Sequence, residues 1–473
     1  MVAGPELVGP RGAPVPVPGA AGPGAGRIGA LDGLRALALL GVLAYHVAPS
    51  AVPGGFLGVE SFFVLSGFLL ASLLIGEQRR EGHVDLRAYA GRRLRRIAPA
   101  LVTLLATLVV LGPVLAPDDA HRLVGDVVSS LAGVTNWHLV ADASSYFDQA
   151  GRPSLVRHLW SVAVEIQFYA ACPFVVTWLW RRRRDLALPV VAAGVVGPAA
   201  VMGLLFSGDD PSRAYYGTDA RVGALLAGVA LALVLARRGE DRPDVDAAPG
   251  AAATGTRPGR AVLAPLGLVA LAGLYLGADD QARWAYPGAF LATQAATVAL
   301  IVAAVEAGPA SRLLAHPALR WLGERSFGIY LWHWPAVALL RPGIDVGLPP
   351  AAAAATGLAA AVVLGALSYR MIERPLLRPR TGLPPPVRAR RRAAGAAAAL
   401  VALAGFAALV ARVPTADPLA DTLREGQRLL ASQVAPAPAP STAPTPAPTA
   451  TAPAATAAIT APPATPPTAP AGR

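Results

Sequence analysis

The chain is dominated by apolar runs of about 17–22 residues that carry almost no charge. A helix of that length crosses roughly 30 Å of hydrocarbon. In lipid, every backbone polar group must find its partner within the protein, so each run is predicted to be a helix. The strands of a membrane barrel are about ten residues long and alternate in polarity, which these runs do not. The sequence therefore predicts an all-α fold, a polytopic bundle of membrane-spanning helices.

Ten core spans and an eleventh C-terminal span are expected. In chain order they are 28–49, 56–76, 97–116, 156–180, 186–207, 218–236, 261–278, 287–306, 326–341, 350–371 and 393–411. They divide the chain into a disordered cytoplasmic N-terminal tail (1–27), a membrane domain (28–380), a cytoplasmic loop with the eleventh span (381–412), and an extracytoplasmic Pro/Ala/Thr-rich linker or tail (413–473).

The formal net charge is +12, and all 41 basic residues are arginine. With the N-terminus in the cytoplasm, the inside loops are 77–96, 181–185, 237–260, 307–325 and 372–392. Together with the N-terminal segment and Arg370, these loops hold about 29 of the 41 arginines, which is the positive-inside pattern. The charge therefore indicates orientation in the lipid bilayer of a plasma membrane and not nucleic-acid binding. The C-terminal tail is expected on the outer side.

Ionisable residues inside the predicted spans are the candidates for function, because charge within a membrane is costly. In the first span, Arg35 and His46 are eleven residues apart, so they lie about 20° apart in azimuth and roughly 16 Å apart along the axis. Glu60, near the start of the second span, is predicted to reach His46 and orient its ring. The alternatives are that Arg35 snorkels, His46 bonds a neighbouring helix, and Glu60 only reaches the outer interface.

The fourth and ninth spans carry further polar residues. His158, Ser161, Glu165 and Tyr169 follow i, i+3, i+7 and i+11 spacing, so they share one helix face. A lone glutamate on that face would be strongly disfavoured without a partner, which favours a functional interpretation. In the ninth span, His333 lies too deep to be an interfacial anchor.

The basic segment 87–96 leads into the third span. Arg93 and Arg96 lie one turn apart at the helix entrance, and guanidinium pairs suit bidentate binding of phosphates. On their own, however, they are more typical of a topology signal and of contact with anionic lipid. Glu373 and Arg374 are explained by a helix stop and charge anchoring. The sequence contains no Cys/His zinc spacing and no Gly-rich phosphate loop, so no metal site is expected.

Six motifs, in order along the chain, resemble those of a known family. They are LDGLRALALLGVLAYH (31–46), GGFLGVESFFVLSGF (54–68), RRLRRIAP (92–99), HLWSVAVEIQFY (158–169), WLGERSFGIYLWHWP (321–335) and SYRMIERPL (368–376). Together they closely resemble membrane acyltransferase family 3, the group that O-acylates cell-envelope polysaccharides in bacteria. The resemblance covers roughly residues 28–380, which we therefore expect to be the acyltransferase membrane domain.

The resemblance implies roles for the residues that match its motifs. The family pattern of a basic residue, ten residues and a histidine falls on Arg35 and His46, and its RxxR pattern falls on Arg93 and Arg96. These positions imply an acyl-CoA donor, acetyl-CoA above all, on the cytoplasmic side, with the arginines holding its phosphates. They also imply that His46 is the catalytic histidine.

Two glutamates are further catalytic candidates, as residues that orient His46. Glu60 stands where relatives usually carry an acidic residue. Glu165 matches the first acid of a stretch that in relatives often reads Glu-Glu-Gln, but Ile166 replaces the second acid here. The remaining candidates are assigned to substrate binding: His158, Trp160, Ser161 and His333.

The function implied is an O-acyltransferase that moves an acyl group from cytoplasmic acyl-CoA to hydroxyls of a cell-envelope glycan or glycolipid. His46 would act as a general base or as a transient acyl-imidazole carrier. The alternative is a transporter or flippase for an acyl group or a lipid-linked sugar; a third interpretation is an inactive scaffold. The eleventh span and tail resemble the subgroup with an external SGNH-type domain, so we expect either a truncated chain or a separate SGNH-type outer partner.

Overall fold

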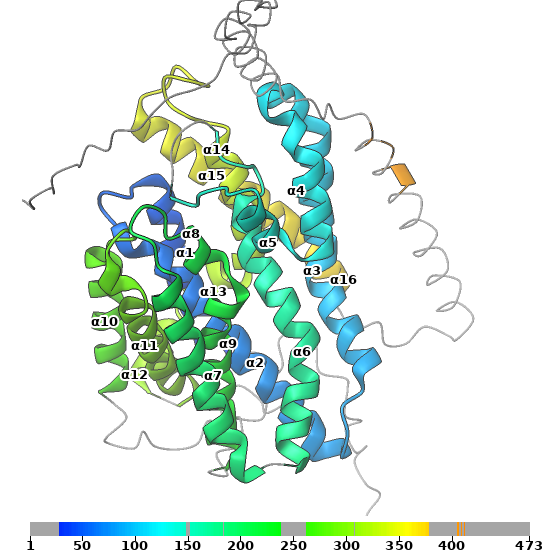
Figure 1. Cartoon of the computed structure of the whole chain (residues 1–473), viewed down its shortest axis with the longest axis vertical. Helices are drawn as coiled ribbons and strands as arrows, with labels where there is room; N and C mark the ends of the chain where they lie inside the picture. The colour runs from blue at the N-terminus through cyan, green and yellow to red at the C-terminus, as the bar shows by residue number, and fades with distance from the viewer. Residues whose placement is uncertain are drawn as a thin grey trace, which may run out of the picture. The chain divides into compact units, whose positions relative to one another are not determined.

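The computed structural model describes residues 28–147, 152–182, 184–237, 262–306 and 308–377, with isolated positions between 404 and 411. These residues form helices and no named strand (Figure 1). The first half contains α1 (Gly29–Val47), η1 (Pro53–Leu57), α2 (Gly58–Glu81), α3 (Leu86–Leu115), η2 (Pro117–Asp119), α4 (Ala120–Ala132), α5 (Thr135–Ala141), η3 (Arg157–Leu159), α6 (Trp160–Arg182), α7 (Arg184–Leu205), α8 (Ser212–Tyr216) and α9 (Thr218–Arg237). The second contains α10 (Leu263–Gly277), η5 (Arg283–Ala285), α11 (Gly288–Val305), α12 (Pro309–Leu314), α13 (Pro317–Glu324), α14 (Ser326–Ala338), α15 (Pro350–Ser368), the π-helical η6 (Tyr369–Glu373) and α16 (Arg374–Leu377).

Within the described residues, seven helical stretches are long and apolar enough to cross a membrane. They are Gly29–Val47, Pro53–Glu81, Leu86–Leu115, Arg157–Trp180, Thr218–Arg237, Gly288–Val305 and Pro350–Leu377. The expected spans 186–207, 261–278 and 326–341 coincide with α7, α10 and α14, whose apolar helical lengths are shorter. The expected eleventh span, 393–411, lies outside the described residues apart from the isolated positions. The all-α, multi-pass class is therefore confirmed, and the structure supports seven of the eleven spans by length and hydropathy.

The segment 77–96, predicted to connect the second and third spans, is mostly helical, because α2 continues to Glu81 and α3 begins at Leu86. Gly82 ends α2 in the left-handed region, at φ +72°. Asp85 then caps α3 by accepting a hydrogen bond from the Ala88 amide. The basic residues 87–96 thus occupy the first turns of a helix, which fixes the spacing of their side chains.

Helices α2 and α9 lie side by side (Figure 1). Their backbones approach each other closely at two glycines. A Cβ added to Gly67 would lie 1.9 Å from the Leu225 carbonyl oxygen, and one added to Gly228 would lie 2.1 Å from the Val64 carbonyl oxygen. Small residues allow such close backbone approach between membrane helices, where burial of apolar surface gives little drive for association. This contact sets which side chains of α2 and α9 face each other.

Candidate active site

His46 stands at the end of α1, and its hydrogen bonds define its tautomer. Its Nδ1 lies 2.9 Å from the Val42 carbonyl oxygen, which only accepts, so Nδ1 carries the proton. Nε2 therefore presents a lone pair, and the Tyr146 hydroxyl lies 3.2 Å from it. The phenol donates to the imidazole, which is the arrangement needed for the imidazole to take a proton from a hydroxyl.

Two histidines that are remote in sequence lie next to His46. The ring centroids of His46 and His333 are 5.0 Å apart, and those of His333 and His158 are 5.4 Å apart. Helix α14 also contributes Trp334, whose ring lies 4.9 Å from that of His46. We call His46, Tyr146, His158, His333 and Trp334 the histidine centre. It unites candidates from the first, fourth and ninth predicted spans.

The other two histidines also have assigned tautomers. His158 Nε2 lies 3.0 Å from the Leu331 carbonyl oxygen, and His333 Nδ1 donates to the Tyr330 carbonyl oxygen. Each ring therefore keeps one lone pair, on His158 Nδ1 and His333 Nε2. Both atoms are buried without a hydrogen-bond partner among the described residues. They can accept hydrogen bonds from a bound hydroxyl or from water.

Ser161 and Trp160 support this centre from α6. The Ser161 hydroxyl lies 2.8 Å from the Tyr330 hydroxyl, which also donates to the His158 carbonyl oxygen at 2.9 Å. Trp160 is buried, and its ring centroid lies 6.4 Å from that of Tyr146. Ser161 thus links α6 to α14, while Trp160 packs behind the tyrosine.

Glu60 does not orient His46. Its carboxylate lies 2.8 Å from the Arg221 guanidinium of α9 and accepts a hydrogen bond from the Gln294 amide of α11 at 2.7 Å. The expectation of a Glu60–His46 contact fails because α2 packs along α9, so Glu60 faces that helix.

Glu165 of α6 lies in a second polar group together with Ser66, Arg35 and Arg96, which we call the Glu165 cluster. Ser66 of α2 donates a hydrogen bond to Glu165, and Arg35 and Arg96 lie close enough to interact electrostatically with that carboxylate. Arg35 also pairs with Asp32 at 3.7 Å. Since Arg35 and His46 share α1, the Glu165 cluster and the histidine centre are separated by roughly 16 Å along that helix. Glu165 therefore belongs with the arginines and not with His46.

Arg93 lies beside this cluster. Its guanidinium packs 5.5 Å from the Tyr169 ring centroid and 5.8 Å from that of Tyr89. Its Nε is buried without a hydrogen-bond partner among the described residues. Arg93 and Arg96 are both half-buried, whereas Arg95 between them is exposed. Burial thus distinguishes Arg93 and Arg96 from Arg95.

Three residues at these sites were missed from the sequence. Tyr146 lies between predicted spans, where no periodic pattern points to it. Arg157 is buried, with its guanidinium 4.2 Å from the Trp334 ring centroid and 5.0 Å from that of Tyr146. Arg221 lies inside the predicted span 218–236 and is fully buried. The position of this charge inside a predicted span is the signal that could have identified Arg221 as a candidate.

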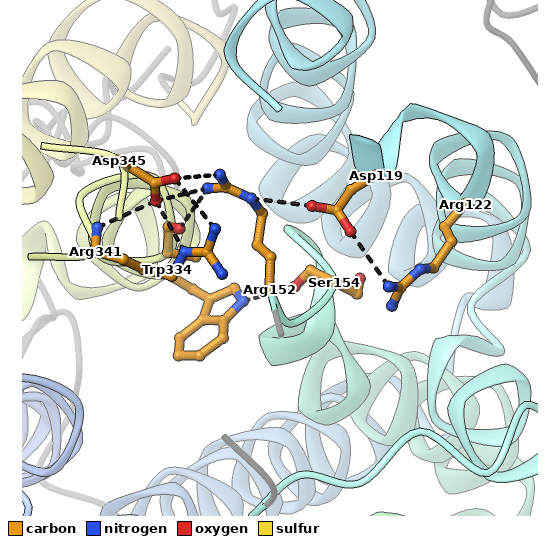
Figure 2. A network of polar contacts seen from close by, with 8 residues as sticks. Asp119, Arg122, Arg152, Ser154, Trp334, Arg341 and Asp345 are labelled. Atoms are coloured by element: carbon orange, nitrogen blue, oxygen red, sulfur yellow. Dashed lines mark hydrogen bonds and ion pairs between the residues drawn. The ribbon is translucent and has the colours of Figure 1, made fainter. Parts of the chain in front are cut away.

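An arginine–aspartate network holds the segment before Arg157 against the end of α14 (Figure 2). Arg152 lies 3.0 Å from Asp119 and 2.6 Å from Asp345, and it donates to the Ala338 carbonyl oxygen at 2.9 Å. Arg341 also binds Asp345, at 2.9 Å. Hydrogen bonding from Arg341 lowers the pKa of the Asp345 carboxyl to about 2, with a smaller contribution from Arg152.

The same segment is tied directly to the histidine centre. The Trp334 indole donates to the Ser154 carbonyl oxygen at 2.8 Å (Figure 2). The Ser154 hydroxyl in turn donates to Asp126 at 2.8 Å. Asp126 also lies 3.5 Å from His138, and hydrogen bonding to it raises the pKa of His138. These contacts connect α4, α5 and α14 through Ser154, which lies four residues before His158.

The apolar helices define a multi-pass membrane protein, and three histidines from different helices lie together within it. The chain belongs to membrane acyltransferase family 3, because the family model described as an acyltransferase domain matches residues 28–370. The resemblance inferred from the six motifs is thereby confirmed.

Curated relatives have similar sequences over the same region. The chain is 36% identical over 355 residues to the peptidoglycan O-acetyltransferase OatA of Listeria monocytogenes, covering 73% of this chain and 55% of that protein. It is 37% identical to the putative peptidoglycan O-acetyltransferase YrhL of Bacillus subtilis, covering 73% and 54%. It is 31% identical to the O-acetyltransferase OatA of Staphylococcus aureus, covering 73% and 56%. The chain thus spans about half the length of these relatives. No solved structure matches it.

Proposed function

We propose that this protein transfers an acetyl group from cytoplasmic acetyl-CoA to hydroxyls of a cell-envelope glycan. The observation that carries the proposal is the His46 Nε2 lone pair, which faces the Tyr146 hydroxyl inside a buried cluster of three histidines. Membership of an acyltransferase family and similarity to proteins named O-acetyltransferases support the reaction class.

Arg93, Arg96 and Arg35 are proposed to hold the phosphates of the donor. The unpaired Nε of Arg93 supports this role, because a buried guanidinium donor is suited to bidentate phosphate contact. The donor supplies a thioester, which is activated toward attack by a hydroxyl. Glu165, close to both Arg35 and Arg96, would hold these arginines in place when the donor is absent.

His46 is proposed as the general base. A hydroxyl oxygen bonds to the acyl carbon, the carbon–sulfur bond breaks, and the hydroxyl proton passes to His46 Nε2 and then to the leaving thiolate. The attacking hydroxyl belongs either to the acceptor or to Tyr146, which already donates to Nε2. In the second case, the acyl group rests on the phenol oxygen before it reaches the glycan. The lone pairs of His158 and His333 would accept hydrogen bonds from the incoming acceptor.

Membranes given radiolabelled acetyl-CoA test the assignment of His46. His46→Ala should abolish transfer of label to envelope glycan, whereas His83→Ala, which changes an exposed histidine, should not. Equal labelling by wild type and His46→Ala would overturn the assignment. Release of free CoA that depends on acceptor separates the transferase from a flippase, and no release at all would indicate an inactive scaffold.

The donor site has its own matched control. Arg93→Ala should mainly raise the donor KM, since its guanidinium would bind the donor and not the reacting atoms. Arg95→Ala changes the exposed arginine two positions away and should leave KM unchanged. Equal KM values for both variants would favour the alternative in which these arginines only set topology.

The proposed direction of transfer requires the N-terminus in the cytoplasm and the tail outside. The distribution of arginines supports this orientation. Labelling of single cysteines placed in the 82–85 turn, using an impermeant thiol reagent on intact cells, tests it: protection is expected, and labelling without lysis would refute it. Adding an SGNH-type domain to the labelling assay tests whether acetyl groups reach the glycan directly or through a separate outer partner of that type.

A further inference from the structure

Arg221 of α9 is fully buried and paired. Its guanidinium lies 2.8 Å from the Glu60 carboxylate, whose exposed fraction is 1%. The pairing follows from the parallel packing of α2 and α9. Each residue lies seven positions before the glycine at which its helix touches the other, Gly67 or Gly228. The helix contact therefore brings the two charges together two turns away.

Aromatic rings surround the Arg221 guanidinium. The ring centroids of Phe290, Tyr215 and Trp160 lie 4.4, 4.9 and 5.3 Å from it, and that of Phe63 lies at 5.7 Å. A planar, delocalised cation can stack on several rings at once, which a lysine ammonium does less well. Among the described residues, the three guanidinium nitrogens have no hydrogen-bond acceptor of good geometry. The rings and the Glu60 charge are therefore its main stabilising contacts.

Two of these rings lead directly to Tyr146. The centroid of Tyr215 lies 4.5 Å from that of Tyr146 and 4.6 Å from that of Trp160. Ser212, on the same short helix as Tyr215, accepts a hydrogen bond from the Tyr146 amide at 2.7 Å. Tyr146, which donates to His46, thus packs against Tyr215 and Trp160. The same two rings pack against the Arg221 guanidinium.

We propose that Arg221 is a positioning residue: held by Glu60, it fixes Tyr215 and Trp160 and thereby places the Tyr146 hydroxyl at His46. The proposal deepens the proposed function and rests on it for the catalytic consequence. Its structural consequence, the ordering of the Tyr146 segment, is independent of any activity.

The alternative is that the ion pair only stabilises the fold. A buried ion pair is weak evidence for that role, since the cost of removing two charges from water offsets their attraction. Loss of one partner leaves an uncompensated buried charge and strongly destabilises the protein. The double variant Glu60→Gln/Arg221→Met removes both charges together and keeps an amide oxygen for Gln294. It is therefore expected to fold, which size-exclusion chromatography in detergent checks.

The first measurement needs no activity. Amide hydrogen exchange is followed by mass spectrometry on the purified full chain, in peptides covering 139–147 and, for reference, α3. In Glu60→Gln/Arg221→Met, exchange in 139–147 should be about tenfold faster or more, with α3 unchanged. The control Arg320→Gln breaks an exposed ion pair, to Glu324 on α13, and it should leave both regions unchanged. Unchanged exchange in 139–147 in the double variant would overturn the proposal.

The second measurement is a cycle with Tyr146→Phe. Glu60→Gln/Arg221→Met should lower kcat about 10–100-fold with donor KM unchanged, because misplacement of a reacting group by about 1 Å costs that much. Adding Tyr146→Phe should then cost little more, since the hydroxyl is already displaced. Fully additive losses would overturn the positioning role. If the wild type transfers no acetyl group, the proposed function fails, and the exchange result alone decides this inference.

Discussion

Replacement of Arg152 by methionine should destabilise the protein much more than replacement of Arg122, although both arginines pair with Asp119. The Arg152 side chain is 9% exposed and bridges Asp119 and Asp345, whereas Arg122 is 48% exposed and makes a single pair at 3.2 Å (Figure 2). Exposed pairs contribute about 0.2–1 kcal/mol, and breaking a buried pair costs about 3–5 kcal/mol.

The expected cost for Arg152→Met lies between these limits. Asp345 keeps Arg341 and Asp119 keeps Arg122, so neither carboxylate loses all its charge partners. We therefore expect a loss of about 2 kcal/mol for Arg152→Met and below about 0.5 kcal/mol for Arg122→Met. At about 2–4 °C per kcal/mol, Arg152→Met should lower Tm by roughly 4–8 °C, and Arg122→Met by at most about 2 °C.

The assay is thermal unfolding of the purified full chain in one detergent, followed by tryptophan fluorescence. Scan rate is held constant, because unfolding of large proteins is often irreversible. The pKa of about 2 for Asp345 adds a second test. A carboxyl group whose pKa is lowered by folding stabilises the protein fully above about pH 3.9, and this stabilisation is lost as the pH falls through 2. The difference in Tm between wild type and Arg152→Met should therefore persist down to about pH 4. Equal Tm shifts for the two arginines would refute the reasoning.

Three further outcomes test other parts of the structure. Tyr146→Phe should lower the rate of acetyl transfer from labelled acetyl-CoA about 100-fold, with donor KM unchanged; a normal rate would remove the phenol from the reaction. Gly67→Ala should yield little folded protein by size-exclusion chromatography, because the added methyl would lie 1.9 Å from a carbonyl oxygen of α9. Gly273→Ala meets nothing within 4 Å and should be tolerated; equal yields would contradict the packing argument. His138→Gln should lower Tm more at about pH 6 than at about pH 9. Hydrogen bonding to Asp126 raises the pKa of His138, and this stabilisation fades as the pH rises through the raised pKa. Equal losses of Tm at the two pH values would refute the ion pair.

Much of the fold was predictable because hydropathy is a local property. Most predicted core spans coincide with observed helices to within a few residues, and α9 begins at Thr218 as expected. The predictions failed where the signal was polar. The basic stretch 87–96 was predicted to lie before the third span because charge is disfavoured in lipid, and it forms the first turns of α3 because a charged sequence with a good N-cap forms a helix readily in water. The helices α4 and α5 were likewise beyond a search for membrane spans.

The candidate site was partly predictable. Helical spacing places Arg35 and His46 on one face of α1, and the structure puts them in two separate polar groups along that helix. The approach of His158 and His333 to His46 could not be read from spacing, because each comes from a different helix.

By itself, the sequence determined the membrane class, the family and several of the ionisable residues that the helices bury. Only the tertiary structure decided their partners. Glu60 binds Arg221 and not His46, and Tyr146, from a segment without periodicity, meets the histidine. The physical reason is that apolar runs specify helices in lipid but not which helices touch. That choice depends on close backbone contacts such as Gly67 on α9, which act across more than 150 residues of chain.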